Sequence, residues 1–276
     1  MTSVAKRALG WLTFAIRLDA LFLRSAVVVA FHRVHDGDPG GLSISRAMFE
    51  RHCRFFKRHF DVVPLREIVT RLESQRSVDG LLAITFDDGY RDNFANARPV
   101  LEALELPATF FVVSDWIGTD TWPWWDRQQG VRHPWMTWDQ VRVLNERGFD
   151  IGAHTRTHAD LGRIHGTPAR EEIVGGRVEI ERQIGRRVDL FAFPYGRRDN
   201  MTESNRALVK AAGFRCCCSC FGGLAGDTTD PFRLQRIAVT PWYESPHHLG
   251  AAMLREAGPS VKREGRCSEI SAAIGY

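Results

Sequence analysis

Short apolar runs rich in β-branched and aromatic residues alternate along the chain with longer segments in which apolar residues recur every three or four positions. The first pattern predicts buried strands, and the second predicts amphipathic helices. Strands are expected at 27–31, 81–86, 108–113, 149–153, 190–193, 214–220 and 234–239, with a weaker one at 61–64. Helices are expected at 46–59, 65–73, 93–104, 137–147, 168–184 and 202–212.

This alternation indicates parallel strands joined by right-handed crossovers, which leaves two α/β folds open, a barrel and a doubly wound sheet. The 276 residues are 44% hydrophobic and 25% charged, a composition typical of folded globular proteins. Two domains would fit this length, but α/β barrels commonly fill about 200–250 residues as one unit. We therefore expect one domain over residues 27–256. Residues 118–134 lack a clear period and are expected to form a long loop.

The two ends of the chain stand apart from this pattern. Residues 1–26 contain an apolar stretch that Arg17 and Asp19 interrupt, and no cleavage site of the usual form follows it. We expect an amphipathic helix there, which either caps the bottom of a barrel or makes peripheral contact with a membrane. Residues 257–276 are expected to form a peripheral tail.

Charge and cysteine usage bear on partners and location. The 37 Lys and Arg against 33 Asp and Glu give a net charge of +4 that is spread along the chain, which does not favour nucleic acid as a partner. Four of the six cysteines fall within residues 216–220 of one expected strand, where neighbours cannot easily form disulfides. Cys217 and Cys220 have the spacing of a metal or redox pair, but packing is favoured because no second pair exists. Reduced cysteines favour a cytoplasmic location for the protein, either free or associated with the inner membrane surface.

Two motifs with chemical potential follow expected strands. Asp87 and Asp88 lie in the sequence TFDDGY directly after the strand at 81–86, at the end of a parallel sheet where active sites are built. His154 and His158 lie in HTRTH after the strand at 149–153, and histidines four apart can bind one ion where the backbone turns helically. Taken singly, the first motif is also an ordinary turn and the second a pair of surface histidines.

A third motif makes the combination more specific. The sequence FAFPYG at 191–196 ends another expected strand with a tight turn, which exposes a backbone amide and the ring of Tyr195. All three motifs would converge on one face of the sheet. One Asp and two His form the ligand set of a catalytic metal with an open position for water, and the second carboxylate can then act as a base.

TFDDGY, HTRTH and FAFPYG, in this order, resemble the first three motifs of the polysaccharide deacetylases, the NodB-like carbohydrate esterase family four. The resemblance implies a distorted (β/α) barrel of about seven parallel strands. It also implies metal-dependent removal of acetyl groups from N-acetylated sugars. By motif matching, Asp88, His154 and His158 would hold the metal, Asp87 would be the general base, and the backbone N–H of Tyr195 would help to hold the oxyanion.

The chain departs from the fuller family pattern at two places. Ala192 stands where many members carry an Arg that orients the catalytic base, so Arg91 or Arg236 would have to hold Asp87. The leaving-group acid of much of the family is a His near the end of the domain, where this chain has His247 and His248 without a leading strand.

A different histidine is the better candidate for the acid. His32 ends the buried-type strand at 27–31 and resembles an N-terminal segment of the poly-N-acetylglucosamine deacetylase branch, where the motif order is permuted. That branch also tends to carry Ala in place of the Arg of motif three. We therefore expect His32 to protonate the departing amine, while a strand-end histidine with a purely structural role is the alternative.

The resemblance implies a hydrolase that removes N-acetyl groups from N-acetylhexosamine units of a bacterial oligo- or polysaccharide, a lipid-linked precursor being one candidate. The expected cofactor is a divalent metal, Zn²⁺ first, with Co²⁺, Ni²⁺ or Fe²⁺ also suited to this ligand set. Removal of O-acetyl or N-formyl groups and a glycan-binding barrel without turnover are the alternatives. Six tryptophans lie in or near the predicted loops, and we expect them as a group to stack on sugar rings: Trp122, Trp124, Trp125, Trp135, Trp138 and Trp242.

Overall fold

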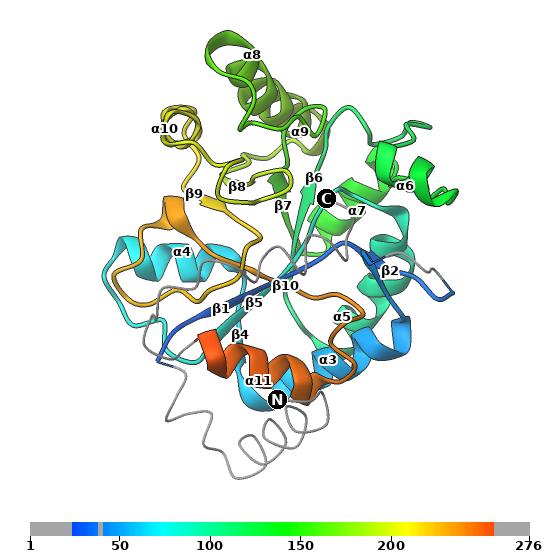
Figure 1. Ribbon diagram of the computed structural model, residues 1–276, viewed down its shortest axis with the longest axis vertical. Coiled ribbons are helices and arrows are strands. Elements are labelled where there is room, and N and C mark those ends of the chain that lie inside the picture. Colours follow the sequence, from blue (N-terminus) through cyan, green and yellow to red (C-terminus); the bar gives the residue numbers. More distant parts are fainter. Residues whose placement is uncertain (1–23, 38–40, 257–276) are drawn as a thin grey trace.

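Eight parallel strands form the central sheet in the part of the chain that the structure describes, residues 24–37 and 41–256 of a computed structural model (Figure 1). They are β1 (Val27–Phe31), β4 (Asp61–Val62), β5 (Leu81–Phe86), β6 (Thr109–Val112), β7 (Asp150–Ala153), β8 (Leu190–Ala192), β9 (Cys216–Cys218) and β10 (Ile237–Ala238). Seven follow one another in the order β10-β1-β5-β6-β7-β8-β9, and β4 pairs with the beginning of β5.

The order of the strands decides between the two folds left open by the sequence. From β1 to β9 the order runs in one direction without the reversal of a doubly wound sheet. A parallel bridge between Cys218 and Leu234 brings β9 to the segment that leads into β10. Because the two ends of the sheet meet over this short contact, the barrel is incompletely closed. The expected distorted (β/α) barrel of seven parallel strands is confirmed.

Helices surround the sheet (Figure 1). They are α3 (Arg46–His59), α4 (Leu65–Glu73), α5 (Arg98–Leu104), α6 (Trp124–Gln129), α7 (Trp138–Glu146), α8 (Gly166–Arg170), α9 (Gly176–Ile184), α10 (Glu203–Ala211) and α11 (Pro246–Glu256), with the π-helical segments η1 (Asn93–Ala97) and η2 (Glu171–Gly175) and the 3-10 turn η3 (Pro231–Arg233). Two-residue strands β2 (Arg33–Val34) and β3 (Ser43–Ile44) form a second small sheet. Local sequence sets several helix ends: the Thr137 hydroxyl and the Gln140 side chain form a capping box at α7.

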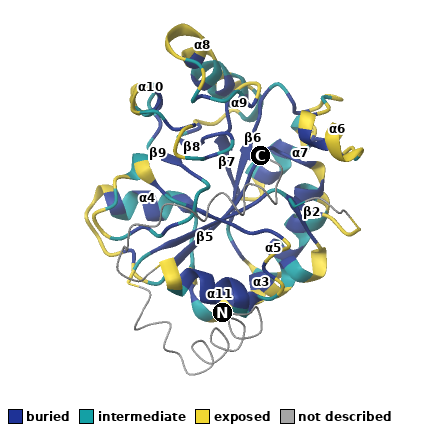
Figure 2. Ribbon diagram, in the orientation of Figure 1, coloured by how far each residue is buried: buried dark blue, intermediate teal, exposed yellow. Residues whose placement is uncertain are grey.

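Side chains of the strands alternate between two buried clusters. In β1, Val27 and Val29 belong to the larger cluster with residues of the surrounding helices, whereas Val28 belongs to a second cluster with Ile68 and Leu72 of α4. Figure 2 shows the strands buried and the exposed residues on the outer turns of helices and loops. Strands covered on both faces explain the continuous apolar runs in the sequence.

The structure differs from the expectations in two main places. Residues 118–134 were expected to be loop throughout, but α6 lies within them because Trp125 and Asp126 are buried against the barrel. The helix α11 was not expected, and it packs against α3 through tertiary contacts. The expected N-terminal amphipathic helix and C-terminal tail lie outside the described residues, apart from residues 24–26. Within the described residues, no helix is long and apolar enough to span a bilayer.

Candidate metal centre

Asp88, His154 and His158 converge at the carboxyl ends of β5 and β7. One ligand atom of each lies within 4.8 Å of the others, and all three residues are buried. Each histidine places its Nε2 atom 3.3 Å from Oδ1 of Asp88. Among the described residues this is the single cluster of at least three such side chains, and it matches the three residues that the motifs predicted as metal ligands.

The backbone around the cluster adopts an uncommon conformation. Asp88, Thr155, His158 and Tyr195 have φ angles of 74°, 63°, 61° and 61°, in the left-handed region that non-glycine residues avoid. Each such residue costs on the order of 1–3 kcal/mol and persists only where surrounding contacts determine it. Gly89 follows Asp88 at φ 88°, and a Cβ atom there would lie 2.7 Å from Ile117 Cδ1. The tight turns therefore aim the motif side chains at one point.

Hydrogen bonding and packing orient the two histidines. Nδ1 of His154 lies 2.8 Å from the carbonyl oxygen of Ala192; when Nδ1 donates this bond, Nε2 is left as the acceptor or ligand atom on the Asp88 side. His158 is held by aromatic rings. Its ring stacks on Trp116 at 5.1 Å between centroids and contacts Trp125 at 5.1 Å and Tyr195 at 4.8 Å.

The carboxylate of Asp88 is suited to a cation. It is fully buried, and neither oxygen accepts a hydrogen bond of good geometry from the described residues. Burial opposes ionisation, but His154 and His158 outweigh it and hold the pKa of Asp88 well below its ordinary value. A buried, ionised carboxylate next to two imidazoles fits the donor set of Zn²⁺ and related metals.

Asp87 lies next to this cluster but has a separate partner. Arg236 donates two hydrogen bonds to its carboxylate, of 2.8 Å from Nη1 and 2.7 Å from Nη2. The guanidinium is itself fixed by Thr85 Oγ1 at 3.0 Å and the carbonyl of Ser219 at 2.7 Å. Burial raises the pKa of Asp87, but the charge and hydrogen bonds of Arg236 outweigh it and lower that pKa. Asp87 is therefore ionised at neutral pH and can accept a proton.

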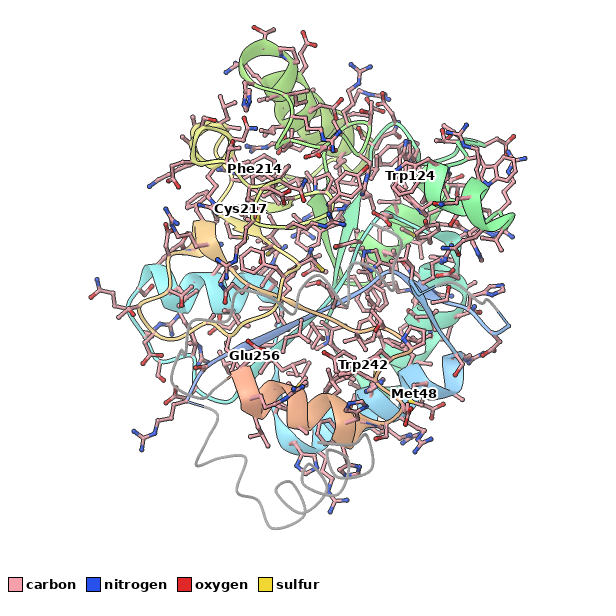
Figure 3. All side chains as sticks on the ribbon, in the orientation of Figure 1. Met48, Trp124, Phe214, Cys217, Trp242 and Glu256 are labelled. Atoms are coloured by element: carbon pink, nitrogen blue, oxygen red, sulfur yellow. The ribbon has the colours of Figure 1, made fainter. Side chains whose placement is uncertain are left out.

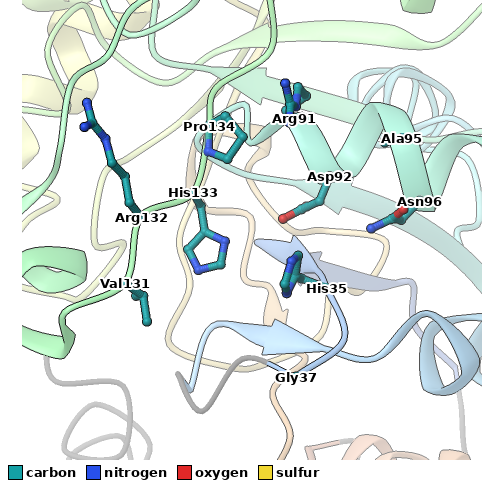
Figure 4. A pocket seen from close by; sticks show the side chains of 10 residues that line it. All are labelled: His35, Gly37, Arg91, Asp92, Ala95, Asn96, Val131, Arg132, His133 and Pro134. Carbon is teal, nitrogen blue, oxygen red and sulfur yellow. The ribbon is translucent and has the colours of Figure 1, made fainter.

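Of the two arginines considered from the sequence, Arg236 and not Arg91 supplies the guanidinium that contacts Asp87. Arg91 lies on the wall of a separate pocket of about 410 Å³. Figure 4 shows this pocket, with the imidazoles of His35 and His133 pointing into it and Asp92 beside them. Arg236 reaches Asp87 from just before β10, 149 positions away in the sequence.

His32 also faces the site. It follows β1, is half-buried, and interacts electrostatically with Asp88 and Asp87. Burial lowers the pKa of His32, and the two carboxylates only partly offset this. The imidazole is therefore biased toward its neutral form, and it has to take up a proton during the reaction before it can donate one. His247 and His248 lie on α11, where they contact Phe55 and Trp242 respectively. The structure thus places His32, rather than these two, within reach of the charges of the cluster.

The tryptophans expected to act as a group are divided by the structure. Trp125 and Trp135 are buried, whereas Trp122 and Trp124 are 40% and 42% exposed. Trp242 is also exposed but lies far from Trp124 (Figure 3). Trp124 combines exposure with a position near the cluster, because it precedes Trp125 in α6 and Trp125 contacts His158. Trp122 lies before α6, where its indole N–H donates to the carbonyl of Val131.

Trp116 was missed by the sequence reasoning. Its ring stacks on His158, and it follows β6 closely, just as the three motifs follow their strands. That shared position was the signal that could have identified it.

The cysteine-rich strand packs rather than reacts. Cys216, Cys217 and Cys218 form β9 and are buried without disulfides. The Cys217 thiol donates to the carbonyl of Phe232 at 2.9 Å, and burial raises its pKa well above the ordinary value. Figure 3 shows Cys217 within the body of the protein. These thiols match the expected packing role.

Comparison with known proteins supports the resemblance to the polysaccharide deacetylases. The family model described as polysaccharide deacetylase matches residues 75–217, just over half of the 276 residues. The Bacillus subtilis (strain 168) protein YxkH, which carries a provisional name as a polysaccharide deacetylase, is 21% identical over 216 residues, or 78% of this chain and 71% of that protein. The Escherichia coli (strain K12) poly-beta-1,6-N-acetyl-D-glucosamine N-deacetylase is 26% identical over 140 residues, or 47% of this chain and 20% of that protein.

Solved structures agree on the fold. The Streptococcus pyogenes deacetylase PplD in complex with acetate is similar with a TM-score of 0.70 at 18% identity, covering 85% of this chain and 99% of that one. IcaB from Ammonifex degensii is similar with a TM-score of 0.69 at 23% identity, covering 83% and 97%. With the motifs in place at the ends of the strands, the extent of the family match establishes that this chain belongs to the polysaccharide deacetylase family and is a hydrolase of that class.

Proposed function

We propose that the protein is a metal-dependent deacetylase that hydrolyses the N-acetyl group of N-acetylhexosamine units in a bacterial glycan. The observation that carries this proposal is the pairing of two different carboxylates. Asp88 is buried beside two imidazoles and accepts no hydrogen bond of good geometry from the part of the chain that the structure describes, whereas Asp87 is kept ionised by its ion pair with Arg236. Adjacent carboxylates in such different environments are suited to two roles, metal ligand and base.

Asp88, His154 and His158 would hold the metal, with Zn²⁺ as the first candidate and Co²⁺, Ni²⁺ or Fe²⁺ as others. A divalent cation bound there supplies a Lewis acid that polarises the acetyl carbonyl and lowers the pKa of water. Asp87 accepts a proton from the water that attacks the carbonyl carbon, and Arg236 keeps its carboxylate in place for this step.

The remaining residues act as the carbon–nitrogen bond breaks. The backbone N–H of Tyr195, in the strained turn after β8, donates to the oxyanion. His32 donates a proton to the departing amine, so acetate and a free amino sugar are the products. The half-exposed rings of Trp122 and Trp124 offer apolar faces on which a pyranose ring can stack.

The printed name of the Escherichia coli relative supports an N-acetylglucosamine polymer as the substrate class, although the chain matches only 20% of that protein. A lipid-linked glycan, peripheral membrane contact through residues 1–26 and a cytoplasmic location remain part of the proposal.

Acetate release from N-acetylglucosamine oligomers tests the proposal. The protein is stripped with a chelator and then reloaded with Zn²⁺ or Co²⁺, and formate release from matched N-formyl substrates and acetate release from O-acetyl substrates are measured beside it. Acetate that appears from the N-acetyl substrate only with metal supports the proposal. Formate or ester-derived acetate alone would move the protein to another acyl group, and glycan binding without any release would contradict a catalytic role.

A further inference from the structure

The loop that carries the second metal-ligand histidine needs support from outside itself. Between His154 and His158 the backbone enters the left-handed region at Thr155, a β-branched residue for which this conformation is a genuine outlier, and again at His158. One side of the loop is tied to the segment after β6, because the N–H of Asp115 donates to the carbonyl of Arg156 at 2.9 Å. That bond leaves the N–H groups of Arg156 and Thr157 to be satisfied from the other side.

Glu172 satisfies both of these groups. Its Oε2 accepts hydrogen bonds from the N–H of Thr157 at 2.8 Å and from the N–H of Arg156 at 3.1 Å. Its Oε1 accepts a third bond from the Thr157 hydroxyl at 2.7 Å. The side chain of Arg156 pairs with Asp115 instead, so the Glu172 carboxylate is directed at the loop backbone and at Thr157.

The helix that carries Glu172 lies unusually close to the loop. Gly176 begins α9, and a Cβ atom there would lie 2.8 Å from the carbonyl carbon of Thr155 and 3.0 Å from the nitrogen of Arg156. Only glycine permits this approach without displacement of the backbone. Glu172 precedes Gly176 by four residues, in the π-helical segment η2, a kind of segment that recurs at functional sites.

We propose that Glu172 is a positioning residue for the metal centre: its carboxylate holds the backbone of Arg156 and Thr157 so that His158 reaches the same point as Asp88 and His154. This inference rests on the proposed metal-dependent function. Glu172 does not belong to the cluster of ligand atoms, so it acts through the loop, in the way that outer residues orient the ligands of known metal sites.

Zinc affinity of chelator-stripped protein tests this role, measured by competition with a chromogenic chelator. Glu172→Ala is expected to weaken Zn²⁺ binding by about 10- to 100-fold, the usual effect of removing such a residue. Glu171→Ala is the matched control, because Glu171 is the exposed neighbour in the same π-helical segment and makes no hydrogen bond to the loop among the described residues. It is expected to bind Zn²⁺ within about twofold of the parent.

Glu172→Gln supplies a conservative rescue. Its amide oxygen can accept the two N–H bonds and its amide nitrogen can donate to the Thr157 hydroxyl, so it should lose less than about tenfold in affinity. The visible absorption spectrum of Co²⁺-loaded protein should change for Glu172→Ala and not for Glu171→Ala, since it reports ligand geometry. A purely structural role would lower the unfolding temperature without changing this spectrum.

The outcomes separate the two proposals. A parent protein that binds no Zn²⁺ would overturn both the metal site and the role of Glu172. A parent that binds Zn²⁺, with a folded Glu172→Ala variant that binds it equally well, would overturn the positioning role alone. If Glu172→Ala does not fold, Thr157→Val removes only the hydroxyl bond and is expected to weaken Zn²⁺ binding several-fold, and unchanged affinity in that variant would count against the inference.

Discussion

The ion pair between Arg236 and Asp87 gives the sharpest energetic prediction. Both side chains are almost completely buried, and the two hydrogen bonds of 2.7 and 2.8 Å make the pair bidentate. Replacement of Arg236 by Met keeps most of the volume and leaves the Asp87 carboxylate buried without its counter-charge. Breaking a buried pair in this way typically costs about 3–5 kcal/mol. Coulomb's law agrees, because unit charges about 4 Å apart attract by about 4 kcal/mol at an effective dielectric constant of about 20.

Urea unfolding of the chelator-treated protein at pH 7 measures this cost. Arg236→Met alone and Asp87→Asn alone are each expected to lower the free energy of unfolding, because each leaves one buried charge uncompensated. The double variant removes both charges, so it should lose about 3 kcal/mol less than the sum of the single losses. Additive losses, or a loss below about 1 kcal/mol for Arg236→Met, would refute the claim that Arg236 neutralises Asp87.

The same variant bears on catalysis. Without Arg236 the carboxylate of Asp87 is no longer fixed, and a displacement of about 1 Å in a reacting group can cost about 100-fold in rate. Deacetylase turnover by Arg236→Met should fall by at least that factor while Zn²⁺ stays bound, because Arg236 contacts none of the three proposed ligands through a hydrogen bond.

His32→Gln should lower kcat on N-acetyl sugars by about 10²- to 10⁴-fold, but should have little effect on p-nitrophenyl acetate, whose leaving group needs no proton; equal losses on both would exclude the acid role. Removal of Trp124 by mutation to Ala should raise KM for oligomers more than it lowers kcat, since the ring lies at the surface, and an unchanged KM would remove it from the sugar-binding surface. Burial lowers the pKa of His52 from 6.5 to about 4, so the folded state resists protonation of this side chain. The free energy of unfolding should therefore fall by about 3 kcal/mol as the pH drops from 6.5 toward 4. In urea titrations His52→Leu should abolish this dependence, and an unaltered pH profile would contradict the prediction.

Local sequence patterns were sufficient for a parallel α/β sheet with the three motifs at one edge, whereas the choice of a barrel and of Asp88 as a ligand came from the resemblance to a family. The apolar runs mark strands covered on both faces, and Asp88 and His154 come within two residues of the ends of two of them. Because parallel strands end at one edge of the sheet, residues placed just after them meet in space. The chain order of the motifs thus carried enough information to predict the cluster.

The contacts that hold the site could not be predicted in the same way. Arg236 lies 149 positions from Asp87, and no local pattern distinguishes it from Arg91 as the partner. The six-residue α6 is too short to show a helical period and is fixed by the buried ion pair of Asp126 with Arg33. The role of Glu172 could not be predicted for the same reason, because it depends on tertiary contact with a loop 15 residues away in the sequence. Side chains that support a site are chosen by packing, which leaves no periodic signal in the sequence.

The separation of roles between the adjacent carboxylates is tested most directly by measuring metal content and acetate release on the same preparations of the parent protein, Asp87→Asn and Asp88→Asn. We expect one equivalent of Zn²⁺ and steady acetate release in the parent protein. Asp87→Asn should retain the metal and release no acetate, whereas Asp88→Asn should lose both. Equal loss of metal in the two variants, or acetate release by Asp87→Asn at the parent rate, would contradict the assignment of Asp88 as ligand and Asp87 as base.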